Sequence, residues 1–116
     1  MNEAEALATH KALWSQAHNP VHYKGETYYP VLGIGESRNF AKIELPGGLL
    51  VITQNLAKRS PNTDWVNKDP NNKLTWIIKD GRYVGKITTT VKDGKTLHRV
   101  YKLNPERIIK TFREDS

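Results

Sequence analysis

Polar and apolar side chains alternate with two different periods along this chain. Near the N-terminus, apolar residues recur every three or four positions, which is the spacing of one face of a helix. Asn2 and Glu5 have the spacing of a capping box, and Pro20 follows the pattern, because the residue before a proline avoids the α region. We therefore predict a helix over about residues 3–17. Its expected core contacts are Leu7 and Trp14.

From residue 21 onward, the pattern changes to β-branched and aromatic residues with a period of two, which is typical of strands. Turns that contain glycine separate the runs, at Lys24-Gly25 and at Pro46-Gly47-Gly48. The predicted strands are Val21–Tyr23, Glu26–Ile34, Asn39–Leu45 and Leu49–Thr53.

Residues 54–73 have no sustained period and are rich in Asn, Pro and charged side chains. An irregular segment of this length is long for a compact domain, and such loops tend to be functional or mobile. A short helical turn near Asn62–Asn67 is one expectation. Trp65 fits an anchor that holds the loop against the core better than an exposed stacking surface, and both interpretations stay open.

A β-meander over Leu74–Leu103 is the clearest element of the sequence. Asp80-Gly81 and Asp93-Gly94 are typical of two-residue type I′ turns, whose central residues need a positive φ. Turns of this length would fix both registers. The predicted cross-strand pairs are Ile78 with Tyr83, Trp76 with Gly85, Leu74 with Ile87, Ile87 with Val100, and Thr89 with His98.

Alternation along these strands divides the meander into two faces. The predicted core face collects Leu74, Trp76, Ile78, Tyr83, Ile87, Val91 and Val100. The predicted basic face supplies the candidate binding residues Lys79, Arg82, Lys86, Lys92, Lys95, Arg99 and Tyr101. No carboxylate is expected on the basic face. Ile77, Val84 and Leu97 also fall on it, and another element would have to pack over them to remove them from solvent. The division depends on both registers, because a slip of one residue exchanges the faces.

The sequence predicts a second helix near the C-terminus. Asn104-Pro105-Glu106 supplies a cap, a proline at the first helical position and a carboxylate near the positive end of the helix dipole. We predict a short helix over about residues 105–113, packed on the sheet through an apolar stripe. The stripe consists of Ile108, Ile109 and Phe112.

These elements predict a single, mainly β domain over residues 1–116. The expected fold is a small antiparallel sheet or partly open barrel with a helix at each end. The alternative is an α+β arrangement in which both helices lie on one face of a single sheet.

Charge is distributed unevenly. Residues 1–57 hold 4 basic and 5 acidic side chains (net −1), whereas residues 58–116 hold 14 and 7 (net +7). A basic surface favours polyanionic partners, although a net charge of +6 also simply keeps a small domain in solution. Cysteine is absent, which excludes disulfides and thiolate metal sites. The longest apolar run, Leu49–Ile52, is far shorter than the ~20 residues that cross a bilayer, so we expect a cytoplasmic protein without membrane contact.

Motifs for metal or cofactor binding are weak. His18 and His22 are separated by Pro20, which prevents the helix that would align them for a metal. Gly33-Ile34-Gly35 lacks the third glycine of a dinucleotide-binding loop, and residues 67–78 lack the glycine and glutamate of a calcium loop. We therefore expect neither a metal nor a cofactor.

The leading functional hypothesis is non-catalytic binding of nucleic acid, DNA or RNA, through the basic meander face. Basic residues at alternate positions lie ~6–7 Å apart along a strand and can follow successive phosphates, and Tyr101 can stack on a base. A plain solvated sheet surface has a similar composition.

Two alternatives belong to other classes. The first is a protein-interaction module or small assembly subunit that binds an acidic partner, through the basic face or along an edge strand. The second is a small metal-independent ribonuclease with His98 as its acid or base and Arg99 as its phosphate clamp. Alternation places these two side chains on opposite faces, so catalysis is not the favoured function.

Overall fold

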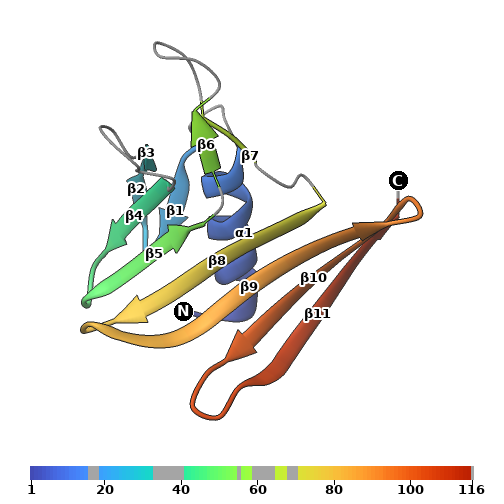
Figure 1. Cartoon of the computed structure of the whole chain (residues 1–116). Helices are drawn as coiled ribbons and strands as arrows, with labels where there is room; N and C mark the ends of the chain where they lie inside the picture. Colours follow the sequence, from blue (N-terminus) through green and yellow to red (C-terminus); the bar gives the residue numbers. More distant parts are fainter. Residues whose placement is uncertain (16–18, 33–40, 55, 59–64, 68–70, 116) are drawn as a thin grey trace.

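The computed structural model describes residues 1–15, 19–32, 41–54, 56–58, 65–67 and 71–115. These residues form one helix and eleven strands, most of which belong to one antiparallel sheet (Figure 1). The elements are α1 (Glu3–Trp14), β1 (Val21–Tyr23), β2 (Glu26–Tyr28), β3 (Val31–Leu32), β4 (Ala41–Leu45), β5 (Leu49–Thr53), β6 (Leu56–Lys58), β7 (Trp65–Asn67), β8 (Asn72–Lys79), β9 (Arg82–Lys92), β10 (Lys95–Lys102) and β11 (Arg107–Asp115).

The predicted N-terminal helix is confirmed as α1. Asn2 Oδ1 accepts from the Glu5 amide at 2.8 Å, and Glu5 Oε1 accepts from the Asn2 amide at 2.8 Å, which completes the predicted capping box. The helix ends at Trp14, where Ser15 turns to an extended conformation. Residues 16–17, in which the helix was expected to end, lie outside the described residues. Trp14 is buried as predicted, but Leu7 is only half-buried.

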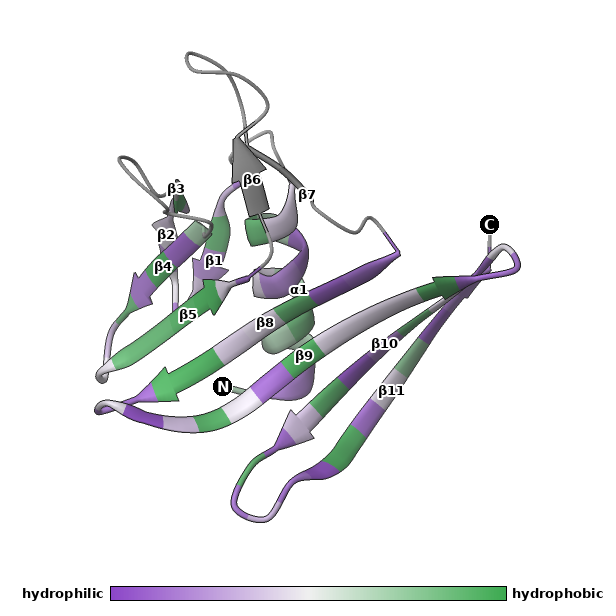
Figure 2. Cartoon of the chain, in the orientation of Figure 1, coloured by the Kyte–Doolittle hydropathy of each residue, from purple (hydrophilic) through white to green (hydrophobic). Residues whose placement is uncertain are grey.

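The main sheet is an open antiparallel sheet with the strand order β11-β10-β9-β8-β5-β4-β3. Its end strands do not pair with each other, so the described strands form no closed barrel. β1–β2 and β6–β7 are separate hairpins, and the second is inserted between β5 and β8. β5 is apolar over most of its length (Figure 2). In the part of the chain that the structure describes, no helix has the length and apolar character that crossing a membrane requires.

α1 packs on one face of the main sheet, with contacts to β4, β5, β9 and β10 (Figure 1). The core lies in this contact, and each large aliphatic side chain buried there contributes about 1.5–3 kcal/mol. Its most completely buried aliphatic side chains are Leu13, Ile43, Val51 and Ile87.

The second meander hairpin has its predicted register. Asp93 and Gly94 have φ values of 54° and 74°, as a two-residue type I′ turn requires. Ile87 lies opposite Val100, and Thr89 lies opposite His98.

The first meander hairpin differs from the prediction beyond its turn. Asp80 and Gly81 have positive φ values of 51° and 80°, so the turn itself has two residues. A β-bulge follows, because Ile78 lies opposite Tyr83 but Ile77 lies opposite Gly85. Val84 is the extra residue of this bulge, and every β8–β9 pair beyond it is shifted by one position.

The bulge exchanges the two faces of β8. Thr75 and Ile77 are buried beneath α1, whereas the predicted core residues of β8 face the other way and are only half-buried. Those residues are Leu74, Trp76 and Ile78. Tyr83, also predicted in the core, is 49% exposed. The core positions predicted for Ile87 and Val100 are confirmed, and Val91 is half-buried on their side of the sheet.

The predicted C-terminal helix is wrong. β11 occupies this segment and pairs with β10 along its length, with a second bulge at Ile109. Asn104 has a φ of 66°, so it lies in a turn and not at a helix cap. Asn-Pro is a signal for turns as well as for helix starts, and pairing with β10 satisfies the backbone groups that a helix would have satisfied internally.

The segment over residues 54–73 contains more structure than expected. Residues 65–67 form strand β7, paired with β6, and not the end of a helical turn. The rest of that expected turn, residues 62–64, lies outside the described residues.

A chain of buried polar side chains connects α1 to the sheet. Thr75 Oγ1 lies 2.6 Å from His10 Nδ1, and Thr89 Oγ1 lies 2.6 Å from His10 Nε2. Thr89 Oγ1 also lies 2.7 Å from His98 Nδ1. Trp14 Nε1 donates to Thr75 Oγ1 at 3.0 Å. All five side chains are buried, so these contacts replace water as their hydrogen-bond partners.

One assignment of the hydrogens satisfies every contact within this chain. The indole of Trp14 can only donate, so Thr75 accepts from it and can donate its hydroxyl hydrogen to His10 Nδ1. His10 then donates from Nε2 to Thr89, which donates to His98 Nδ1. The remaining hydrogen of neutral His98 is on Nε2, which lies 3.2 Å from the carboxylate of Glu114. This assignment of the hydrogens leaves no donor facing a donor.

Burial makes His10 a source of pH-dependent stability. Desolvation, together with the charges of His98, Lys73 and Lys11, lowers the pKa of His10 from 6.5 to about 3. Because the unfolded chain binds a proton at this position below pH 6.5 and the folded chain does not, the free energy of unfolding falls as the pH falls from 6.5 towards 3.

We predict that replacing His10 with Gln removes this component of the pH dependence. The wild-type free energy of unfolding should fall more steeply below pH 6.5 than that of the variant, by up to about 1.4 kcal/mol per pH unit. Chemical denaturation at a series of pH values measures both slopes. His22→Gln is the matched control, because His22 is exposed on β1. Equal slopes for wild type and His10→Gln would contradict the prediction.

Candidate functional site

The face of the main sheet opposite α1, here called the outer face, gathers aromatic and basic side chains. Strand pairing places Trp76 opposite Lys86, and Lys86 opposite Tyr101, on three neighbouring strands. Tyr83 and Ile78, which pair nearer the turn, point to the same side as Trp76. Figure 1 shows α1 behind these strands.

The structure brings together five of the seven predicted binding residues. Those on the outer face are Lys86, Lys92, Lys95, Arg99 and Tyr101. Lys79 and Arg82 lie opposite each other on β8 and β9, and Lys79 lines a cavity on the α1 side. The prediction that these two cations share the basic face is therefore wrong. The bulge at Val84 is the reason, because it reverses the side to which residues near the turn point.

Four side chains form a row across β8, β9 and β10, here called the aromatic–cation row. The rings of Tyr83 and Trp76 meet edge to face with their centroids 5.3 Å apart. Lys86 Nζ lies 5.9 Å from the centroid of the Trp76 ring and 4.6 Å from that of Tyr101. One ammonium group between two aromatic rings holds both rings in place through cation–π attraction.

The outer face is less positive than predicted. Glu106, in the turn between β10 and β11, forms an ion pair with Lys86. Asp115 lies opposite Lys95 at the far end of β11. The prediction that no carboxylate reaches this face is therefore wrong, because the turn and β11 supply two.

A shallow hollow of about 400 Å³ continues the row along β9 and β10. Arg99 lies opposite Thr88 in this hollow, and Tyr101 and Lys86 line its end. Leu97 lies beside it and is half-buried, whereas Ile77 and Val84 belong to the other face. The hollow therefore combines cations, hydroxyl groups and an aromatic ring within a few residues of two strands.

Sequence reasoning missed three outer-face residues. Trp76 and Tyr83 were assigned to the core. Apart from Thr75, Leu74–Ile78 is apolar on both of its faces, so hydrophobic alternation does not decide which face is buried. Arg113, opposite Leu97, was assigned to a helix and belongs to β11. The Asp-Gly turn was the available signal for the hairpin, and it carries no information about a bulge four residues away.

The position of His98 agrees with its prediction. The ring is 5% exposed on the α1 side, and its neighbour Arg99 points to the outer face, so this pair does not meet on one surface. Nε2 of His98 lies within ion-pair distance of Glu114 but is not aligned for a hydrogen bond. The ring is thus part of the connection between helix and sheet.

Glu114 joins His98 to α1. Its Oε1 accepts from Lys11 Nζ at 2.5 Å. The hydrogen bond from Lys11, and then the nearby imidazole of His98, lower the pKa of the Glu114 carboxyl. No group of three metal-ligating side chains is found among the described residues. His22 is exposed, and His18 lies outside them.

No family model, no curated protein and no solved structure matches this chain.

Proposed function

We propose that the outer face binds single-stranded nucleic acid without reading its base sequence. The aromatic–cation row supports this proposal most directly. Tyr83, Trp76 and Tyr101 present rings from three neighbouring strands of a sheet face that no described helix covers. Sheet-borne aromatic rings are a recurrent means of stacking unpaired bases.

Stacking favours a single strand over a duplex. The flat faces of bases in a duplex are already occupied by their neighbours, whereas an unpaired base can lie on a protein ring. Tyr83 is 49% exposed and is the most accessible ring of the row. Tyr101 is half-buried and borders the hollow in which Arg99 lies, so a base on this ring brings its phosphate near a cation.

Arg99 and Lys92 are the cations best placed to hold phosphates. Both project from the outer face, and no carboxylate in the described part of the chain forms an ion pair with either. Lys86 is already neutralised by Glu106, so its role is to position the rings. Along β9 and β10, alternate residues are ~6–7 Å apart, which suits the spacing of phosphates in an extended strand.

The first prediction concerns the salt dependence of binding. Fluorescence anisotropy of a labelled 12-nucleotide DNA or RNA should show binding at ~50 mM salt that weakens steeply as salt rises. The double variant Lys92→Gln and Arg99→Gln should bind more weakly and lower the slope of log K against log salt by about 1.4, because two phosphate contacts are lost.

Lys79→Gln combined with Arg82→Gln is the matched control, since it removes the same charge from the other side of the sheet. Its affinity and salt slope should stay near those of wild type. No binding of the wild type at ~50 mM salt, or an equal loss in both double variants, would contradict the proposal.

The second prediction concerns stacking. Tyr101→Ala should weaken binding of the same oligonucleotide by about 5- to 150-fold, the equivalent of ~1–3 kcal/mol for one stacked base. Tyr101→Phe keeps the aromatic ring and should bind nearly as tightly as wild type. Tyr29→Ala is a surface control, because Tyr29 is 64% exposed away from the row. Unchanged affinity in Tyr101→Ala would remove this ring from the proposed site.

A further inference from the structure

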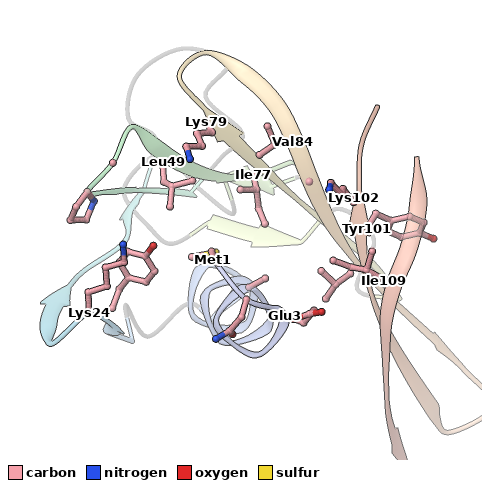
Figure 3. A pocket seen from close by; sticks show the side chains of 17 residues that line it. Met1, Glu3, Lys24, Leu49, Ile77, Lys79, Val84, Tyr101, Lys102 and Ile109 are labelled. Carbon is pink, nitrogen blue, oxygen red and sulfur yellow. The ribbon is translucent and has the colours of Figure 1, made fainter. Parts of the chain in front are cut away.

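A cavity of about 440 Å³ lies on the α1 side of the sheet, between the first turn of α1 and the turn-proximal ends of β8, β9 and β10 (Figure 3). This volume is within the ~300–1,000 Å³ typical of pockets for small ligands. The cavity lies on the other side of the sheet from the aromatic–cation row, and Tyr101 is the one member of the row that also contributes to its lining. The rest of the lining is separate from the row, so the cavity is a second candidate site.

The walls of the cavity are mostly apolar. Their buried apolar part comes from α1, β1, β5, β8 and β10, and includes Ala6, Tyr23, Leu49, Ile77 and Val100. Val84 and Ile109 form its exposed edge and are 38% and 43% exposed.

Val84 and Ile109 share a structural origin. Val84 is the extra residue of the bulge in β9, and Ile109 is the extra residue of the bulge in β11. Bulges redirect side chains and are over-represented next to binding sites. Here, two separate bulges each direct one aliphatic side chain to the same cavity, although both side chains remain substantially exposed. Burial within this protein does not explain their positions.

Three lysines surround this apolar interior. Lys24 comes from the turn between β1 and β2, Lys79 from the end of β8, and Lys102 from the end of β10. Among the described residues, none of the three has a carboxylate within ion-pair distance. Figure 3 shows Lys24 and Lys79 on the side of the cavity near Leu49. Lys102 lies on the opposite side with Ile109, where Glu3 also lines the cavity. Positive charge without a lining carboxylate is therefore found at the Lys24–Lys79 end, and Ile109 marks the aliphatic end.

We infer that this cavity binds an anionic amphiphile, a carboxylate with an unbranched alkyl chain. The alkyl chain lies between Val84 and Ile109 and covers their exposed surface, a contact favoured by the removal of apolar area from water. The carboxylate lies at Lys24 and Lys79, neither of which forms an ion pair with a described carboxylate.

Decanoate below its micelle concentration and decan-1-ol below its solubility limit test this inference by titration calorimetry or NMR chemical-shift changes. Decanoate should bind more tightly than the alcohol, because only the carboxylate pairs with the lysines. Lys24→Gln combined with Lys79→Gln should weaken decanoate binding roughly tenfold and leave the alcohol unchanged. Lys92→Gln combined with Lys95→Gln removes the same charge from the outer face and should change neither affinity.

Two matched isoleucine variants test the aliphatic end of the cavity. Ile109→Asp should weaken both ligands, whereas Ile108→Asp should weaken neither, because Ile108 lies opposite Tyr101 and is not part of the cavity lining. Both side chains are exposed, so both variants should fold. Absence of decanoate binding, equal affinity for the alcohol, or equal effects of the two isoleucine variants would overturn the inference. If either isoleucine variant fails to fold, the lysine variants still test the inference. None of these measurements uses an oligonucleotide, so their outcome does not depend on the proposed binding of nucleic acid.

Discussion

The hydrogen-bonded chain from Trp14 through Thr75, His10 and Thr89 to His98 determines which side of the sheet is the inside. Each of these buried groups would lose its water on folding, and an unsatisfied partner would cost ~1–3 kcal/mol. Only one packing of α1 places both threonine hydroxyls against the imidazole of His10. The network therefore specifies both the position of the helix and the face of β8 that it covers, and aliphatic packing alone would not discriminate between the two faces as sharply.

One extra residue connects the two candidate sites. The bulge at Val84 turns Thr75 inward to His10 and turns Trp76 outward to Lys86. The same bulge directs Val84 to the cavity beneath the sheet. Without it, the register would place Trp76 under the helix, and neither the aromatic–cation row nor the mouth of the cavity would exist. The outer face and the cavity are thus two consequences of one local irregularity.

Much of the fold could be predicted from the sequence, and the failures have identifiable causes. The capping box at Asn2 and the turn at Asp93-Gly94 are local signals, and the helix and hairpin that they predict are present. Leu74–Ile78 is apolar on both faces except for Thr75, so hydrophobic alternation could not choose a face, and the polar partner that decides is 65 residues away at His10. The prediction of a C-terminal helix was wrong because Asn104-Pro105 suits a turn equally well, and the following segment pairs with β10 as a strand. Five of the seven predicted binding residues share the outer face. The positions of Trp76 and Tyr83 on that face could not be predicted, because they depend on the bulge at Val84.

Nuclear Overhauser effects from the imidazole protons of His10 report which face of β8 lies beneath α1. Cross-peaks are expected to the methyl groups of Thr75 and Thr89, which lie on the covered face of β8 and β9. Cross-peaks from His10 to the rings of Trp76 or Tyr83, without the one to Thr75, would show the register that lacks the bulge and would contradict the inward position of Thr75.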